Sequence, residues 1–143
     1  MSRDVGIGEI LLSDGSRLLL KILIINVRES PLDFMPFGGV NFNVDVVGGI
    51  SIKELSNEVK GLIRDKPTML VYPIDGWEII PIKSHENAMA YTVVDSSKGK
   101  FIVKVSAEVV MAARNVKYRS VSNEPFYWLS WVYKISWEPY NGE

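Results

Sequence analysis

Histidine and carboxylate side chains are the groups in this chain best suited to acid–base chemistry. The single histidine, His85, is followed by Glu86, and Asp75 and Glu78 lie a few residues before it. Imidazole titrates near neutral pH, so a His–carboxylate pair can move protons. A lone histidine in a polar turn, however, is typical of an ordinary surface. We therefore expect no catalytic residue and no cofactor, and the chain favours a binding protein over an enzyme.

A glycine pair is the second candidate for chemistry. Gly48-Gly49 precedes Ser51, and Ser51 with Glu54 forms the capping-box pattern of a helix start. Backbone amides at a helix start attract anions. Gly48, Gly49 and Ser51 therefore form a candidate anion-binding site. The segment lacks the lysine and the further glycines of a phosphate-binding loop, and turn geometry alone also explains the glycine pair.

A basic segment spans residues 98–119. Six cationic side chains stand there against one acid, Glu108, so the segment is basic although the whole chain has a net charge of -1. A cationic stripe can neutralise the phosphates of a nucleic acid. We favour a solvated sheet face whose lysines discourage edge pairing, because the total charge is not basic and aromatic residues are few among these charges. The six cations are Lys98, Lys100, Lys104, Arg114, Lys117 and Arg119.

The most unusual residues form an aromatic segment, 126–137, which holds three of the four tryptophans. Side chains alternate between the two faces of a strand. One face is explained as core, since aromatic side chains bury large areas; it carries Tyr127, Leu129, Trp131, Tyr133, Ile135 and Trp137. The other face carries Phe126, Trp128 and Val132, which are candidate interface residues for another copy of the chain, because aromatic residues are enriched in interfaces. A ligand-stacking platform is the alternative.

Composition limits the remaining classes of site. The chain has 143 residues, 47% of them hydrophobic, and no sign of a domain boundary, so we expect a single domain over 1–143. Cysteine is absent, which excludes disulfides, thiolate metal sites and a cysteine nucleophile. With one histidine we expect no metal site. The absence of cysteine and glutamine leans toward a thermophilic source.

Neither a secretory signal nor an apolar run long enough to span a membrane is visible in the sequence. We therefore expect a cytoplasmic protein with no membrane partner.

Turn signals and alternation position these residues. Asp14-Gly15 between apolar runs predicts a hairpin of strands 7–12 and 17–28. The second of these strands is apolar on both faces, which predicts a central strand buried on both sides. A strand at 40–47 and an amphipathic helix at 52–65 follow. Further strands are expected near 68–72, 77–83, 88–95, 100–111 and 126–137, with a short strand in 115–121 least defined.

The sequence therefore predicts an α+β fold: a mainly antiparallel β sheet, or partly closed barrel of about seven or eight strands, with one amphipathic helix at 52–65. The first functional hypothesis is a non-enzymatic binding or assembly protein that acts as a homo-oligomer. The alternatives are a nucleic-acid-binding protein that uses residues 98–119, and a small-molecule enzyme or carrier with a cavity between helix and sheet.

Overall fold

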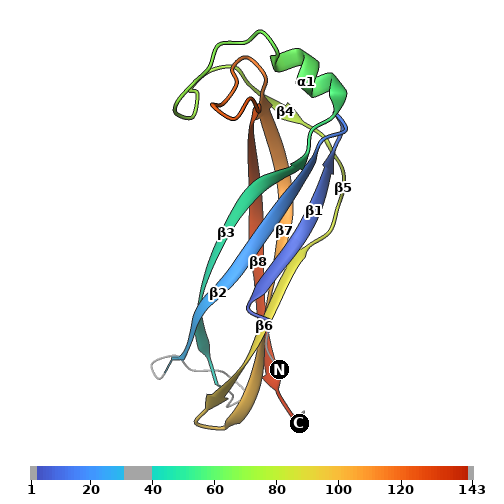
Figure 1. Ribbon diagram of the computed structural model, residues 1–143. Coiled ribbons are helices and arrows are strands. Elements are labelled where there is room, and N and C mark those ends of the chain that lie inside the picture. Colours follow the sequence, from blue (N-terminus) through green and yellow to red (C-terminus); the bar gives the residue numbers. More distant parts are fainter. Residues whose placement is uncertain (1–2, 31–39, 142–143) are drawn as a thin grey trace.

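The structure is a computed structural model that describes residues 3–30 and 40–141. Two antiparallel sheets form the layers of an elongated molecule (Figure 1). Sheet 1 has the strand order β3-β2-β1-β5; in sheet 2, β7 pairs with β8 along one edge and with β6 and β4 along the other. The strands are β1 (Val5–Leu12), β2 (Arg17–Glu29), β3 (Phe42–Glu54), β4 (Trp77–Ile80), β5 (Ile82–His85), β6 (Ala88–Ser96), β7 (Gly99–Asn115) and β8 (Phe126–Pro139). With the helix α1 (Asn57–Ile63), they confirm the α+β class.

Sheet 1 is built around the predicted hairpin. Gly15 has a φ of 86°, the left-handed conformation that the tight turn requires, and the Asp14 carboxylate accepts a hydrogen bond of 2.9 Å from the amide of Ser16. β2 lies between β1 and β3, as its apolar composition predicts.

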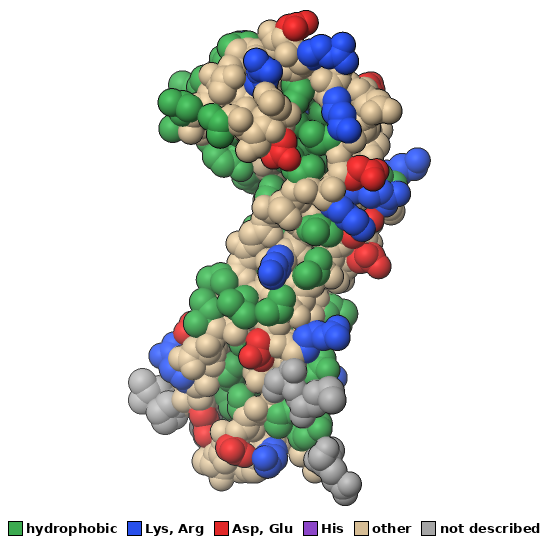
Figure 2. Space-filling view, in the orientation of Figure 1, with side chains coloured by type: hydrophobic (Ala, Val, Ile, Leu, Met, Phe, Trp, Pro, Cys, Tyr) green, Lys and Arg blue, Asp and Glu red, His purple; other side chains and the backbone are tan. Residues whose placement is uncertain are grey.

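The outward face of β2 differs from the sequence prediction. Its inward face is fully buried, but Leu23 and Ile25 on the outward face are exposed, so the strand is not buried on both sides. Val5 and Val47 pair with Leu23 from the neighbouring strands and are exposed too. Figure 2 shows hydrophobic side chains gathered over β2 and β3. Sheet 1 therefore has an apolar outer face.

One run of chain, residues 77–96, links the two sheets. Its first part, β4, pairs with β7; its middle part, β5, leaves to pair with β1; and its last part, β6, returns to β7. Arg3 and Tyr91 exchange two backbone hydrogen bonds of 2.9 Å, which tie the chain before β1 to β6. The sheets are thus joined along one side of the molecule.

Two glycines of β1 make this junction possible. A Cβ atom at Gly6 would overlap the backbone carbonyl of Met89, and one at Gly8 would overlap that of Glu86 and lie 2.8 Å from the amide nitrogen of Ala88. Any side chain would push the two backbones apart. The Gly-Ile-Gly sequence of β1 is therefore required by the close contact of β1 with β6.

On the opposite side of the molecule, side chains connect the edge strands β3 and β8. The Trp131 and Tyr133 rings lie against Gly48, where a Cβ atom would be 2.6 Å from the Tyr133 hydroxyl. Lower down, the ring of Trp137 meets that of Phe42 edge-on at 5.5 Å. The sequence left open a partly closed barrel; in the described residues β3 pairs with β2 and β8 with β7, and the sheets form a sandwich.

The core lies between the inner faces of the sheets. Fully buried aliphatic side chains dominate it, and each contributes about 1.5–3 kcal/mol by leaving water. Val59 and Ile63 are the buried residues of α1 and cover one end of the molecule. The largest fully buried hydrophobic side chains are Ile10, Leu12, Leu18, Leu20, Ile22, Val59, Val103 and Val105.

The region predicted as helix 52–65 divides differently. Ser51 and Ile52 continue β3, opposite Leu19 and Leu18 of β2, so Ser51 does not cap a helix. The helix begins at Asn57, and its N-cap is Ser56, whose hydroxyl accepts from the amide of Val59 at 3.3 Å. The long partner strand β2 offers a hydrogen-bonded ladder that the local capping pattern cannot match.

Two expected strands are reduced to a single bridge. Of the predictions at 68–72 and 115–121, the structure retains one isolated parallel bridge between Thr68 and Arg119. The Arg119 amide donates to the Pro67 carbonyl, and the Arg119 carbonyl accepts from Met69. This bridge fixes the loops beside α1.

Candidate interaction surface

Four exposed hydrophobic side chains form what we call the tryptophan patch, on the outer side of sheet 2. Trp128 of β8 and Ile79 of β4 both pair with Ala113 of β7, so their side chains share a face. Val110 lies at a bulge of β7, and Val132 lies four residues along β8. The exposed fractions are 73% for Ile79, 59% for Val110, 44% for Trp128 and 47% for Val132. Contiguous apolar exposure of this kind marks interaction surfaces.

Phe126 differs from its predicted partners Trp128 and Val132. Its ring is half-buried and packs on the Tyr72 ring at 5.5 Å, and Tyr72 stacks on Trp77 at 5.9 Å. Phe126 therefore belongs to an aromatic stack within the chain. Ile79 and Val110, which sequence reasoning missed, take its place beside the exposed tryptophan.

The inward face of β8 is core in its first half only. Tyr127 and Leu129 are buried, but Tyr133 and Ile135 are 36% and 41% exposed. The prediction that all six inward residues are core is wrong for these two. The Tyr133 hydroxyl nevertheless reaches Gly48 of β3, so the ring crosses between the two edge strands while part of it stays in contact with water.

The outer edge of β8 lacks two of the usual protections against pairing, charge and proline. Among the described residues, β8 pairs with β7 alone, and Phe126–Tyr133 contains no charge and no proline. The other long edge strand, β3, carries Asp45, a glycine pair and Lys53. Charges and glycines discourage edge-to-edge pairing, and an apolar edge strand invites it.

A buried polar network stabilises the end of the sandwich that carries α1, which we call the head. The Asp14 carboxylate, whose side chain is 4% exposed, accepts from the Tyr127 hydroxyl and from Nη1 of Arg114, both at 3.0 Å. Nε of Arg114 donates to Glu78 at 2.7 Å. Burial raises the pKa of the Tyr127 hydroxyl well above its usual value, and the Asp14 carboxylate adds to the shift. The network ties the β1–β2 turn to β4, β7 and β8.

The basic segment is dispersed along β7 and the loop that follows. Lys100 lies 3.7 Å from Asp95, Lys104 lies 2.9 Å from Glu138, and Lys117 contacts Asp75. Arg114 belongs to the buried network, and Arg119 lies beside α1. Most of these cations therefore have a carboxylate partner within the chain, and nucleic-acid binding stays a prediction from sequence.

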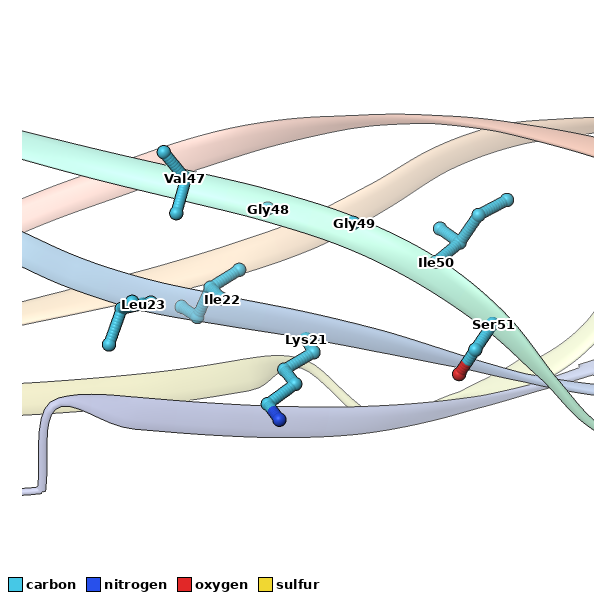
Figure 3. A pocket seen from close by; sticks show the side chains of 8 residues that line it. All are labelled: Lys21, Ile22, Leu23, Val47, Gly48, Gly49, Ile50 and Ser51. Carbon is cyan, nitrogen blue, oxygen red and sulfur yellow. The ribbon is translucent and has the colours of Figure 1, made fainter.

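The predicted anion site at Gly48, Gly49 and Ser51 does not have its expected geometry. All three residues lie inside β3, away from the start of α1, so the helix amides are not beside the glycine pair. Lack of side chains leaves a shallow hollow of about 330 Å³ there instead, with Lys21 and Leu23 on one side of the sheet and Ile50 on the other (Figure 3).

His85 ends β5 and is exposed opposite Ile10 of β1. The Glu108 pKa lies below its usual value, chiefly because Lys134 donates a hydrogen bond to that carboxylate, with His85 a minor contributor. In the described part of the chain, no group of three or more His, Asp or Glu side chains is placed to hold a metal ion. Within the same residues, no helix is long and apolar enough to cross a membrane.

Comparison of the chain with protein-family models, with curated proteins and with solved structures finds no match.

Proposed function

We propose that this protein is a non-enzymatic assembly subunit that self-associates through the outer edge of β8 and the tryptophan patch. The observation that carries the proposal is the charge-free, proline-free edge Phe126–Tyr133 beside exposed Trp128 and Val132. A cytoplasmic location and a thermophilic source stay predictions from composition.

The partner that best fits this edge is a second copy of the same strand. Two identical strands that pair antiparallel are related by a two-fold axis, so each donates and accepts the same set of bonds and the assembly closes. That axis stands perpendicular to the sheet, and both outer faces point the same way. The two tryptophan patches then merge into one apolar surface, which removes exposed area and unpaired edge together.

One register satisfies both faces of the strand. With Ser130 opposite Ser130 of the partner, Trp128 faces the partner's Val132 on the outer side, and Leu129 faces the partner's Trp131 on the inner side. Lys134 falls opposite Phe126, so no like charges meet. The Tyr72 hydroxyl donates to the Tyr127 carbonyl at 3.3 Å, so the part of the edge that is free to pair begins at Trp128.

Replacing Trp128 with glutamate is expected to convert the oligomer to a monomer. A large aromatic side chain at the centre of an interface contributes about 2 kcal/mol or more, and the new charges would face apolar neighbours. Sedimentation equilibrium measures the change. Val5→Glu, on the outer face of sheet 1, is the matched control and should leave the assembly intact. A wild type that is monomeric at micromolar concentration would overturn the proposal, as would dissociation by Val5→Glu alone.

The register is tested by single cysteines, because the chain has none of its own. Opposite residues of an antiparallel pair lie about 4.5–5.5 Å apart at Cα, within reach of a disulfide. Ser130→Cys is therefore expected to cross-link two chains on mild oxidation, and Ser136→Cys, on the same face of the same strand, is not. Efficient cross-linking through Ser136→Cys rather than Ser130→Cys would exclude this register while leaving self-association itself standing.

A further inference from the structure

A small cavity beside α1 is lined by three cations that have no carboxylate partner in the described structure. Its volume is about 230 Å³, and its lining residues are Lys60, Ile63, Arg64, Arg119 and Asn123. Eight other Lys and Arg side chains of the described residues form ion pairs within the chain, whereas Lys60, Arg64 and Arg119 form none of these. Figure 2 shows Lys and Arg side chains at the end of the molecule that carries α1.

Arg119 is the residue that makes this cavity unusual. Its Nε atom is buried and has no hydrogen-bond partner, the only buried side-chain nitrogen or oxygen of the described residues in that position. An unsatisfied guanidinium N–H costs free energy and calls for an acceptor. The backbone of Arg119 is held by hydrogen bonds to Pro67 and Met69, which fixes the point from which its side chain extends.

Asn123 completes the donor set. Its Oδ1 accepts a hydrogen bond of 3.2 Å from Nη1 of Arg119. The side-chain nitrogen of Asn123, Nδ2, is a further donor at the cavity. The backbone of Asn123 has a φ of 61°, a conformation that residues other than glycine rarely adopt. Its backbone N–H donates to the Ser120 carbonyl. Lys60 of α1 and Arg64, its C-cap residue, stand one turn apart and line the same cavity.

We infer that this cavity binds a small oxyanion of the phosphate type. Guanidinium and ammonium groups recognise phosphate oxygens through charge-assisted hydrogen bonds, and three cations with an amide donor match the several acceptors of a tetrahedral oxyanion. Ile63, which is buried, lines one wall and suits the short carbon chain of a phosphate monoester. The inference is independent of self-association, because the cavity lies beside α1 and not on β8.

The test is calorimetric titration of the whole chain with inorganic phosphate and, in a second arm, with glycerol 3-phosphate, at ionic strength held constant with sodium chloride. Binding of either probe at one site per chain is expected. Arg119→Gln and the double variant Lys60→Gln/Arg64→Gln should each weaken it about tenfold. Lys66→Gln removes a neighbouring exposed cation outside the cavity and should have no effect. Stronger binding of the ester than of the free ion would identify the monoester as the natural form.

Failure of both probes to bind would overturn the inference, and so would equal weakening by Lys66→Gln, which would indicate diffuse charge attraction. The double variant alters two exposed side chains only, so it remains informative even if Arg119→Gln perturbs folding, which circular dichroism would detect. Unchanged phosphate affinity in the double variant would also exclude the site.

Discussion

Alanine in place of Gly8 is expected to lower the free energy of unfolding by about 3 kcal/mol, the upper part of the usual range for overpacking. The new methyl group would overlap the carbonyl of Glu86 and meet the backbone of Ala88, and backbone cannot rotate aside as a flexible side chain can. β1 and β6 would have to separate at the junction of the two sheets. Urea unfolding followed by tryptophan fluorescence measures the loss.

Gly49→Ala is the matched control for that substitution. It lies on another strand of sheet 1, and a Cβ atom there would meet nothing within 4 Å. Glycine weakens a strand interior by roughly 0.5–1 kcal/mol relative to alanine, so this variant should be as stable as the wild type or slightly more so. Equal losses for the two variants would contradict the close contact of β1 with β6.

The second large effect is expected at Asp14. Asp14→Ala should lower the free energy of unfolding by about 3–5 kcal/mol, because it leaves the half-buried Arg114 cation and the buried Tyr127 hydroxyl without their shared acceptor. Asp14→Asn keeps one acceptor oxygen and should lose less. Thermal and urea unfolding of both variants give the difference.

Asp75→Ala provides the comparison on the surface. Asp75 also contacts a cation, Lys117, and a tyrosine hydroxyl, that of Tyr118, but its side chain is about half exposed. Ion pairs between exposed side chains contribute little to stability, so this change should be small. If Asp14→Ala is as mild as Asp75→Ala, the network at the head of the sandwich does not stabilise the fold.

Local signals explain which parts of the fold were predictable. The hairpin is encoded by Asp14-Gly15 and by the alternation on each side of it, and both strands lie where the pattern places them. The strands predicted near 88–95 and 126–137 correspond to β6 and β8 and rest on the same kind of signal. These features depend on residues that are close together in the sequence, so local patterns are enough to predict them.

The start of the helix was mispredicted because a distant partner changed the outcome. Ser51 to Glu54 has the capping-box pattern, but Ile50 and Ile52 also alternate in the manner of a strand. Only the length of β2, whose Leu18 lies opposite Ile52, decides between them. The helix start expected beside the glycine pair, on which the candidate anion site was based, is absent from that position for the same reason.

The interaction surface was predictable in part. Alternation alone places Trp128 and Val132 outward on β8, and both are exposed. Ile79 joins them because β4 pairs with the far end of β7, and Val110 because β7 bulges, and neither event has a local signature. The cavity beside α1 was missed altogether, since Arg119 comes from a loop far along the chain from Lys60 and Arg64.

The run of residues 77–96 has a consequence for how the molecule opens. Its middle part hydrogen-bonds to sheet 1 and its two ends to sheet 2, so the sheets cannot separate unless the ladder of β5 with β1, or those of β4 and β6 with β7, is broken. The sandwich should therefore unfold as one cooperative unit, with slowly exchanging amides of β2 and β7 sharing a single opening free energy in hydrogen-exchange experiments. Residues 77–96 therefore couple the opening of one sheet to the opening of the other.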